Sequence, residues 1–335
     1  MATNVITAAA GENQLTGQLR TYYVRRFIEE LNPKLIFNAF GVADTIPARE
    51  GRIISWPTMT NIGAGETLAE ADDGTAGTLT TSAVTATLAD YGKFFRMSSY
   101  FDTATPDPVL DTLVARMARR AARDLDAATR DVLNASSNIY RVGGVAADAN
   151  IGSSDVIAKA DIDTVVNSFE EADVEPVTDF LLPTGGVGTL PGEPAYIAVA
   201  HAHVINDLRK NASTVLWDDV STYVQGNGIL PGEAGKTGRL RWLNAGSAGV
   251  FAADTGGGAG TDVYSVQCFG ADAFGVVDLA GRPAQIWAVP AGTASHGNPL
   301  GRRGSLGWTA EHAAAILTDA AVQIIHTAST FGDNT

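Results

Sequence analysis

The sequence of 335 residues predicts a globular protein that mixes helices and strands, of the α/β or α+β class. Hydrophobic residues make up 45% of the chain, which is typical of a protein with a sizeable core. One long stretch, residues 106–135, has helical periodicity, and short apolar runs alternate with helical segments over residues 161–290. The 36 glycines indicate many turns around a β-rich frame.

The first 45 residues are expected to form an arm. A helix is predicted over residues 16–31, where apolar side chains follow one stripe, and Asn32-Pro33 should end it. An apolar patch follows, made of Leu35, Ile36, Phe37 and Phe40. Such a patch on an arm lies either in the core of its own chain or against a neighbouring subunit.

Residues 46–98 are expected to form a long two-stranded excursion. A strand over residues 51–56 should end at Pro57, and a second strand over residues 79–88, rich in Thr, Val and Ala, should continue through residues 91–97. The tip between them, residues 63–74, is polar and acidic. Because a two-stranded hairpin alone in water is only marginally stable, we expect it to lie on something else, and a neighbouring subunit is the natural candidate.

Residues 106–135 give the clearest helix, beginning at a proline with acids in its first turn. The apolar residues that recur at intervals of three and four are Leu110, Val114, Met117, Ala121, Leu125, Ala128 and Val132. A basic stripe also runs along this helix, made of Arg116, Arg119, Arg120 and Arg123. It is either a solvated face paired with nearby acids such as Asp124 and Asp126, or an inner surface that faces DNA phosphates or another subunit.

Shorter elements follow along residues 161–290. Helices are predicted over residues 161–172 and 204–210, and strands over residues 194–200, 240–244, 263–269 and 285–289.

Charge and cysteine content exclude several classes of protein. The formal net charge is −14 and no long basic run is present, which argues against a sequence-reading DNA-binding protein. No stretch is apolar for about 18 residues, and the first residues lack the pattern of a signal peptide. The one cysteine, Cys268, cannot form an internal disulfide, and its apolar surroundings predict a small buried side chain in a strand.

Candidate chemical groups are few. His201 and His203 would share one face of an extended segment and could begin a metal site, but no third ligand is evident, so a strand end that meets a helix is the favoured interpretation. His312 beside Glu311 lacks a nucleophile. Residues 255–262 are rich in glycine but lack the Gly-Lys-Ser/Thr ending of a phosphate loop. We therefore expect no catalytic residues, no metal and no cofactor.

Short motifs in order along nearly the whole chain resemble one family. They are YYVRRF at residues 22–27, IFNAFG at 36–41, ADYGKF at 89–94, LDAATRDVLN at 125–134, GKTGRLRWL at 235–243, FGADAFG at 269–275, and the block at 298–320. Together they resemble the N4-like group of major capsid proteins from tailed bacteriophages, which have an α+β fold of the Hong Kong 97 type.

This resemblance implies a division of the chain. Residues 1–45 would be an N-terminal arm, 46–98 an extended loop that reaches a neighbour, 99–160 a peripheral domain carrying the spine helix 106–135, 161–295 an axial domain, and 296–335 a strand returning to the peripheral domain. The arm is too short for a scaffolding segment, so any scaffold would be a separate protein. The tip has no lysine over residues 58–87, so we expect subunits to associate without covalent cross-links.

The resemblance also implies a function. The chain would assemble into pentamers and hexamers of an icosahedral shell around double-stranded phage DNA, in the cytoplasm of a bacterial host, with a portal as a further partner and no membrane. The sequence leaves open whether a decoration protein is also a partner. The residues expected at intersubunit contacts are Arg49, Arg52, Glu66, Glu70, Asp72, Asp73, Arg96, Phe37 and Phe40. An encapsulin-like compartment holding an enzyme is the alternative within the fold, and a hydrolase or metal enzyme is the alternative outside it.

Overall fold

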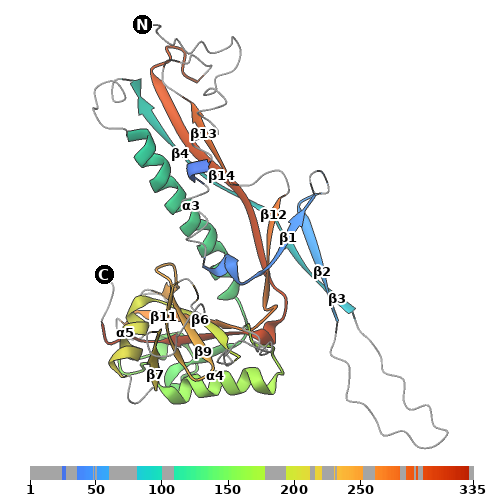
Figure 1. Ribbon diagram of the computed structural model, residues 1–335, viewed down its shortest axis with the longest axis vertical. Helices are drawn as coiled ribbons and strands as arrows, with labels where there is room; N and C mark the ends of the chain where they lie inside the picture. Colours follow the sequence, from blue (N-terminus) through green and yellow to red (C-terminus); the bar gives the residue numbers. More distant parts are fainter. Residues whose placement is uncertain are drawn as a thin grey trace, which may run out of the picture.

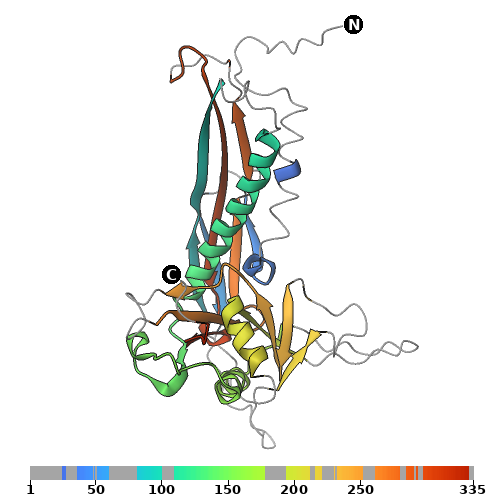
Figure 2. The same cartoon turned by 90° about the vertical axis from the view of Figure 1, so that its left-hand side faces the viewer.

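Figures 1 and 2 show the computed structural model as an elongated part, in which helix α3 lies along a long sheet, and a compact part at its lower end. The structure describes residues 25–27, 36–47, 49, 51–59, 81–99, 109–177, 194–211, 216–220, 230, 232–251, 261–279, 284–289, 292 and 297–331. Of the helix predicted over residues 16–31, only residues 25–27 are described, and they are helical.

The elongated part is built around one long strand, β14 (Arg303–Ile316). β4 (Ala89–Ser98) runs antiparallel along one edge of it, from His312↔Ala89 to Arg303↔Ser98. β13 (Gln285–Val289) and β12 (Phe274–Leu279) follow one another along the other edge, and β1 (Val42–Ile46) joins β12 in parallel. The expected return of the C-terminal region as a long strand is therefore observed for residues 303–316.

Helix α3 (Val109–Leu133) covers one face of this sheet. Its buried residues Val114, Met117, Ala121 and Leu125 belong to the predicted apolar stripe. They pack on alternate residues of the sheet, namely Ile286, Leu306, Trp308 and Ala310. The period of the helix and the alternation of the strand thus bring their apolar faces together.

The buried face of β14 changes between residues 312 and 313. Residues 304, 306, 308, 310 and 312 are buried on the side of α3, whereas from residue 313 the odd positions are buried. Ala313 and Ala315 pack against a two-stranded ribbon, β2 (Ile53–Met59) with β3 (Thr81–Thr87). The base of the excursion therefore lies on its own chain, where we had expected a neighbouring subunit. Its tip, residues 60–80, lies outside the described residues.

Pro57 does not end its strand, contrary to the prediction, because it occupies a position that needs no N–H donor. Leu88 donates its backbone N–H to the carbonyl of Arg52, so the pair 52/88 is hydrogen-bonded. Hydrogen-bonded and non-hydrogen-bonded pairs alternate along an antiparallel ladder, which places Pro57↔Ala83 among the non-hydrogen-bonded pairs. β2 also has no second partner strand among the described residues, so proline is tolerated there.

The compact part contains an eight-stranded sheet. Its strands, in spatial order, are β5 (Ile139–Arg141), β15 (Val322–Thr327), β11 (Val263–Phe269), β6 (Tyr196–Ala200), β9 (Leu240–Asn244), β8 (Glu233–Thr237) and β7 (Trp217–Asp219), with β10 (Val250–Phe251) also on β11. Helices α4 (Lys159–Glu171) and α5 (Ala202–Lys210) are close to their predicted ranges, and the strands predicted over residues 194–200, 240–244 and 263–269 are confirmed.

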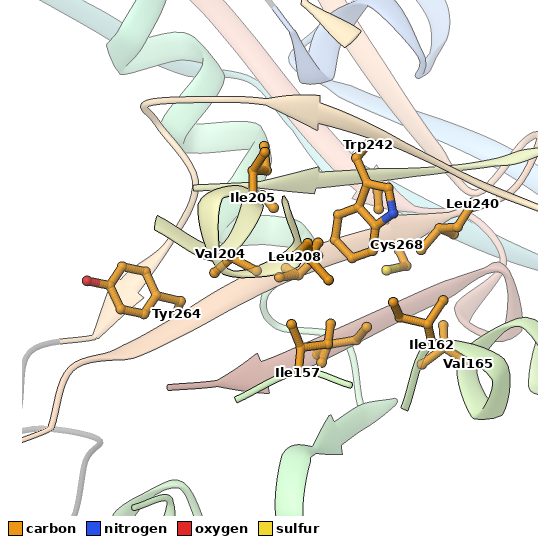
Figure 3. Close-up of a cluster of buried hydrophobic side chains, with 14 of the residues drawn as sticks. Ile157, Ile162, Val165, Val204, Ile205, Leu208, Leu240, Trp242, Tyr264 and Cys268 are labelled. Carbon is orange, nitrogen blue, oxygen red and sulfur yellow. The ribbon is translucent and has the colours of Figure 1, made fainter. Parts of the chain in front are cut away.

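Figure 3 shows the main core of this part. Ile162 and Val165 of α4, Leu208 of α5 and Trp242 of β9 meet there around the fully buried Cys268. Cys268 is thus a small apolar core residue in a strand, as predicted. A second core continues into the elongated part, because it includes Leu133 at the end of α3 as well as residues of β6, β11 and β12.

The boundaries at residues 160 and 295 that we expected from the sequence do not coincide with the sheets. β5, expected with the long helix, lies in the compact sheet, and so does β15, expected to return to the peripheral domain. β12 and β13, expected in the axial domain, belong to the long sheet. Boundaries inferred from the sequence keep residues that are close in sequence in one domain. These strands, however, pair with partners that are far away in the sequence.

Candidate interaction surfaces

The predicted apolar patch on the arm is divided between core and surface. Phe37 is fully buried in the core shared by the two parts, so its side chain offers a neighbour no surface in this subunit. Phe40 is half-buried, and its ring centre lies 5.8 Å from that of Phe269. The sequence left open whether the patch lies in the core of its own chain or against a neighbouring subunit. The structure places Phe37 in the core of its own chain.

One buried carboxylate fixes this segment to α3. Asp126 Oδ1 accepts the backbone N–H groups of Ile36 at 3.0 Å and Phe37 at 2.9 Å, and its Oδ2 accepts the hydroxyl of Ser247 at 2.8 Å. Burial raises the pKa of Asp126 although these hydrogen bonds and nearby Arg130 act in the opposite direction. Asp126 is therefore a structural anchor and does not pair with the basic stripe.

The arginines expected at the extended loop lie on exposed surface. Arg52 forms an ion pair with Asp90 at 2.6 Å, which ties the base of the ribbon to the start of β4. Arg49 is exposed and has a positive φ of 78°. The guanidinium carbon of Arg96 lies 5.3 Å from the centre of the Phe94 ring. The acids expected at the loop tip, Glu66, Glu70, Asp72 and Asp73, lie outside the described residues.

A close contact sets where the ribbon leaves the sheet. The indole of Trp56 lies on Gly275 of β12, where a Cβ atom would come within 2.8 Å of the ring. Val84 and Ala86 of β3 pack beside it on Ala313 and other residues of the sheet. Small residues on the sheet thus allow the ribbon backbone to approach closely.

The basic stripe of α3 is confirmed as an exposed surface. Arg116, Arg119, Arg120 and Arg123 are all exposed, on the side of the helix away from the sheet. One of them, Arg120, pairs with Asp124 one helical turn later at 2.9 Å. The stripe therefore keeps a concentration of positive charge on a chain whose net charge is −14.

The residues considered for catalysis or metal binding have structural roles. His201 caps the N-terminus of α5 directly after β6, and His203 Nδ1 lies 2.8 Å from the hydroxyl of Tyr264. Burial, with a smaller effect of His203, lowers the pKa of His201. His312 is buried, with Nε2 2.9 Å from Thr129 Oγ1 on α3. No group of three potential metal ligands occurs among the residues that the structure describes.

Two further carboxylates have structural roles that the sequence did not predict. Asp148 accepts hydrogen bonds from the buried His326 at 2.8 Å and from Arg141 at 2.5 Å. Buried Asp207 of α5 accepts from Ser329 and Thr330 and so holds the segment after β15. Apart from the Arg141–Asp148 pair, these contacts join residues more than 100 positions apart, so no local motif signals them. Among the described helices, none is long and apolar enough to cross a membrane.

Comparison with known proteins identifies the class of fold. No family model and no curated protein matches the chain. Among solved structures, the capsid of Ralstonia phage GP4 matches with a TM-score of 0.67 and 14% identity, covering 98% of both chains. The cyanophage Pam1 capsid follows at 0.61 and 12%, with 98% of both chains covered. The head of Helicobacter pylori bacteriophage KHP40 gives 0.54 and 11%, with 97% of this chain and 96% of that one covered. The fold is the α+β Hong Kong 97-type capsid fold.

Proposed function

We propose that this chain is the major capsid protein of a tailed bacteriophage. The observation that carries the proposal is the match along 98% of both chains to the capsid of Ralstonia phage GP4, in fold and in extent. The elongated part corresponds in this proposal to the peripheral domain, the compact part to the axial domain and the ribbon to the extended loop. The motifs quoted above support placement in the N4-like group.

The proposed activity is assembly. Subunits associate into pentamers and hexamers and close into an icosahedral shell, with the ribbon and exposed arginines such as Arg49 and Arg96 at contacts between neighbours. Phe40 and the acids at the loop tip belong to the same proposal. A separate scaffolding protein and a portal are the further partners, and assembly takes place in the host cytoplasm before the subunit becomes part of the virion.

The exposed arginine stripe of α3 supports a place for double-stranded DNA inside the shell. Arginine neutralises phosphate charge without reading sequence, so a stripe of this kind suits non-specific contact with packaged DNA. The three solved structures named above come from phage capsids or heads, which supports a phage capsid over the encapsulin-like alternative.

Negative-stain electron microscopy of the purified chain, with and without its phage's scaffolding protein, tests the proposal. We expect closed shells or free capsomers, and an absorbance ratio at 260 and 280 nm that reports DNA when shells come from infected cells. A chain that stays monomeric with the scaffold present would contradict the assembly function. Shells filled with protein in place of DNA would support the encapsulin-like alternative.

A further inference from the structure

Among the described elements, the chain passes between the elongated part and the compact part three times. The crossings follow α3, β11 and β14, at residues 134–138, 270–273 and 317–321. We call these crossings the neck. Hydrogen bonds join them to one another, since Ser136 donates to Asp319 at 2.8 Å and the N–H of Leu317 donates to the carbonyl of Ala273 at 2.9 Å. A narrow neck is by itself a pivot about which the two parts can tilt.

Beside the neck, three polar residues of one stripe of α3 reach the compact part. They are Asp126, Arg130 and Asn134, spaced four residues apart. Asn134 directly follows the helix and continues the stripe, because its N–H donates to the carbonyl of Arg130 at 2.8 Å. Ser247 of the compact part is held by the first two, since its hydroxyl donates to Asp126 Oδ2 at 2.8 Å and its carbonyl accepts from the Arg130 guanidinium at 2.6 Å. Two residues of α3, one turn apart, thus grip one residue.

Asn134 makes the third contact, with the interior of the compact sheet. Its Oδ1 accepts from Ser265 Oγ and from Gln267 Nε2, both at 2.8 Å. Ser265 and Gln267 are fully buried in β11, and Oε1 of Gln267 has no hydrogen-bond partner among the described residues. A buried amide oxygen without a partner lowers stability. Gln267 is therefore better explained by the direction of its hydrogen bond to Asn134 than by a gain in stability.

We call these residues the brace. It consists of Asp126, Arg130, Asn134, Ser247, Ser265 and Gln267. The apolar core around Leu133 also joins the two parts, but apolar contact has no preferred direction, whereas a hydrogen bond weakens steeply when its angle changes. From residue 126 to 134 the brace spans about 12 Å, at about 1.5 Å per residue, and α3 is about 37 Å long. A displacement at the brace is therefore about threefold larger at the far end of α3, the upper end in Figure 1.

We propose that the brace fixes the angle between α3 and the compact part and thereby makes the shell uniform in size. The inference rests on the proposed assembly function and goes beyond it, because it names the residues that determine curvature. In a closed shell the same contacts repeat in every copy, so a small change of angle within each subunit changes the curvature of the whole. The brace residues act as positioning residues, through the geometry of their own subunit.

Two substitutions loosen the brace with little loss of stability. Ser247→Ala leaves Asp126 with the backbone N–H groups of Ile36 and Phe37, and Gln267→Met leaves Asn134 with the hydroxyl of Ser265. Methionine is unbranched like glutamine and removes the unpartnered oxygen. We therefore expect the melting temperature of the free subunit to change by only a few degrees in the double variant.

Ser168→Ala with Gln323→Met is the matched control. Ser168 of α4 donates to Gln323 of β15, the strand beside β11, so this contact lies within the compact part. Each double variant removes one serine and one glutamine, but only the brace variant breaks hydrogen bonds between α3 and the compact part.

Spin labels report the angle in the free subunit. Thr112→Cys near the start of α3 and Glu171→Cys at the end of α4 are exposed labelling sites, whereas the native thiol of Cys268 is fully buried. Double electron–electron resonance then gives the distribution of distances between the two labels. We expect a narrow distribution in the wild-type background and in the control, and a broader or shifted one in the brace variant.

Shell diameter is the second readout. Wild type and control, assembled with the scaffolding protein under the same conditions, should give shells of one diameter by electron microscopy. The brace variant should give shells of several diameters or sheets that do not close.

The outcomes separate the brace from the assembly function. An unchanged distance distribution in the brace variant overturns the inference, and so do shells of unchanged diameter built from subunits whose distances have changed. A control that behaves like the brace variant also overturns it, because the effect is then a general loosening. Wild-type protein that forms neither shells nor capsomers overturns the assembly function and the claim on shell size together, whereas the spin-label distances still decide whether the brace fixes the angle.

Discussion

At the scale of single residues, Asp126 connects the segment after the arm to the long helix. Its carboxylate accepts two backbone N–H groups that have no other described acceptor. We expect Asp126→Ala to lower the free energy of unfolding by about 2–5 kcal/mol, because two partly or fully buried donors lose their partner. Asp126→Asn keeps an acceptor oxygen in nearly the same place and should cost less than half as much. Chemical denaturation at pH 7 measures both, and equal losses would contradict the role as a hydrogen-bond anchor.

The same residue has a predictable pH dependence. Burial raises the pKa of Asp126 above its usual value of 3.8, so the folded chain binds this proton more tightly than the unfolded chain does. Its contribution to stability is then fully present below pH 3.8 and is lost as the pH rises through the raised pKa. The difference in unfolding free energy between wild type and Asp126→Asn should follow this direction in denaturation series from pH 3.5 upward. A difference that does not change with pH would contradict it.

The contribution of Asp148 to stability is expected to change with pH in the opposite direction to that of Asp126. Burial alone would raise its pKa, but the hydrogen bonds from His326 and Arg141 outweigh burial and hold the pKa of Asp148 below 3.8. The stabilisation is therefore present above pH 3.8 and is lost as the pH falls through the lowered pKa. We expect Asp148→Asn to lower the free energy of unfolding by about 1–2 kcal/mol at pH 7. The variant should also lose less stability than the wild type as the pH falls below 3.8. Asp131→Asn, which breaks an exposed pair with Arg130, is the control and should change stability by less than 1 kcal/mol.

At the scale of elements, Gly275 determines how the ribbon lies on the sheet. A side chain there would collide with the Trp56 ring, so the ribbon must shift or tilt. We expect Gly275→Ala to lower the free energy of unfolding by about 1–3 kcal/mol and to reduce shell yield, because the ribbon then leaves the sheet in a different direction. Gly246→Ala is the matched control, since a Cβ there meets nothing within 4 Å. Thermal denaturation and electron microscopy measure the two effects, and equal behaviour of the variants would contradict the argument.

The elements differ in how far the sequence predicts them. Helix α3 and strands such as β6 and β11 follow from local periodicity and apolar runs, and their predicted ranges hold to within a few residues. The continuation of β2 through Pro57 could not be predicted, because it depends on which pairs of a ladder carry hydrogen bonds. The same holds for the pairing of β4 and β13 with β14. Phe94 and Trp287 are almost 200 positions apart, and only the register of β14 brings them into one row.

For the whole molecule, the arginine stripe should determine how strongly subunits hold DNA. We expect free capsomers to bind duplex DNA without sequence preference and with an affinity that falls steeply with salt. Replacing Arg116, Arg119, Arg120 and Arg123 by glutamine should lower the slope of log affinity against log salt by as much as about 4. Replacing Lys159, Lys210, Lys236 and Arg239 on the compact part by glutamine removes the same number of charges and is the control for net charge. Fluorescence anisotropy measures the slopes, and equal slopes would contradict an inner position of the stripe.

The place of β15 in the compact sheet has a consequence for synthesis. β15 lies between β5 and β11, although its residues, 322–327, leave the ribosome after those of every other strand. Until they emerge, β5 has no partner and one edge of β11 is open, so the nascent chain cannot close this sheet. A subunit released early would expose unpaired strand edges, which chaperones and proteases recognise. The compact sheet can therefore close only after translation has passed residue 327.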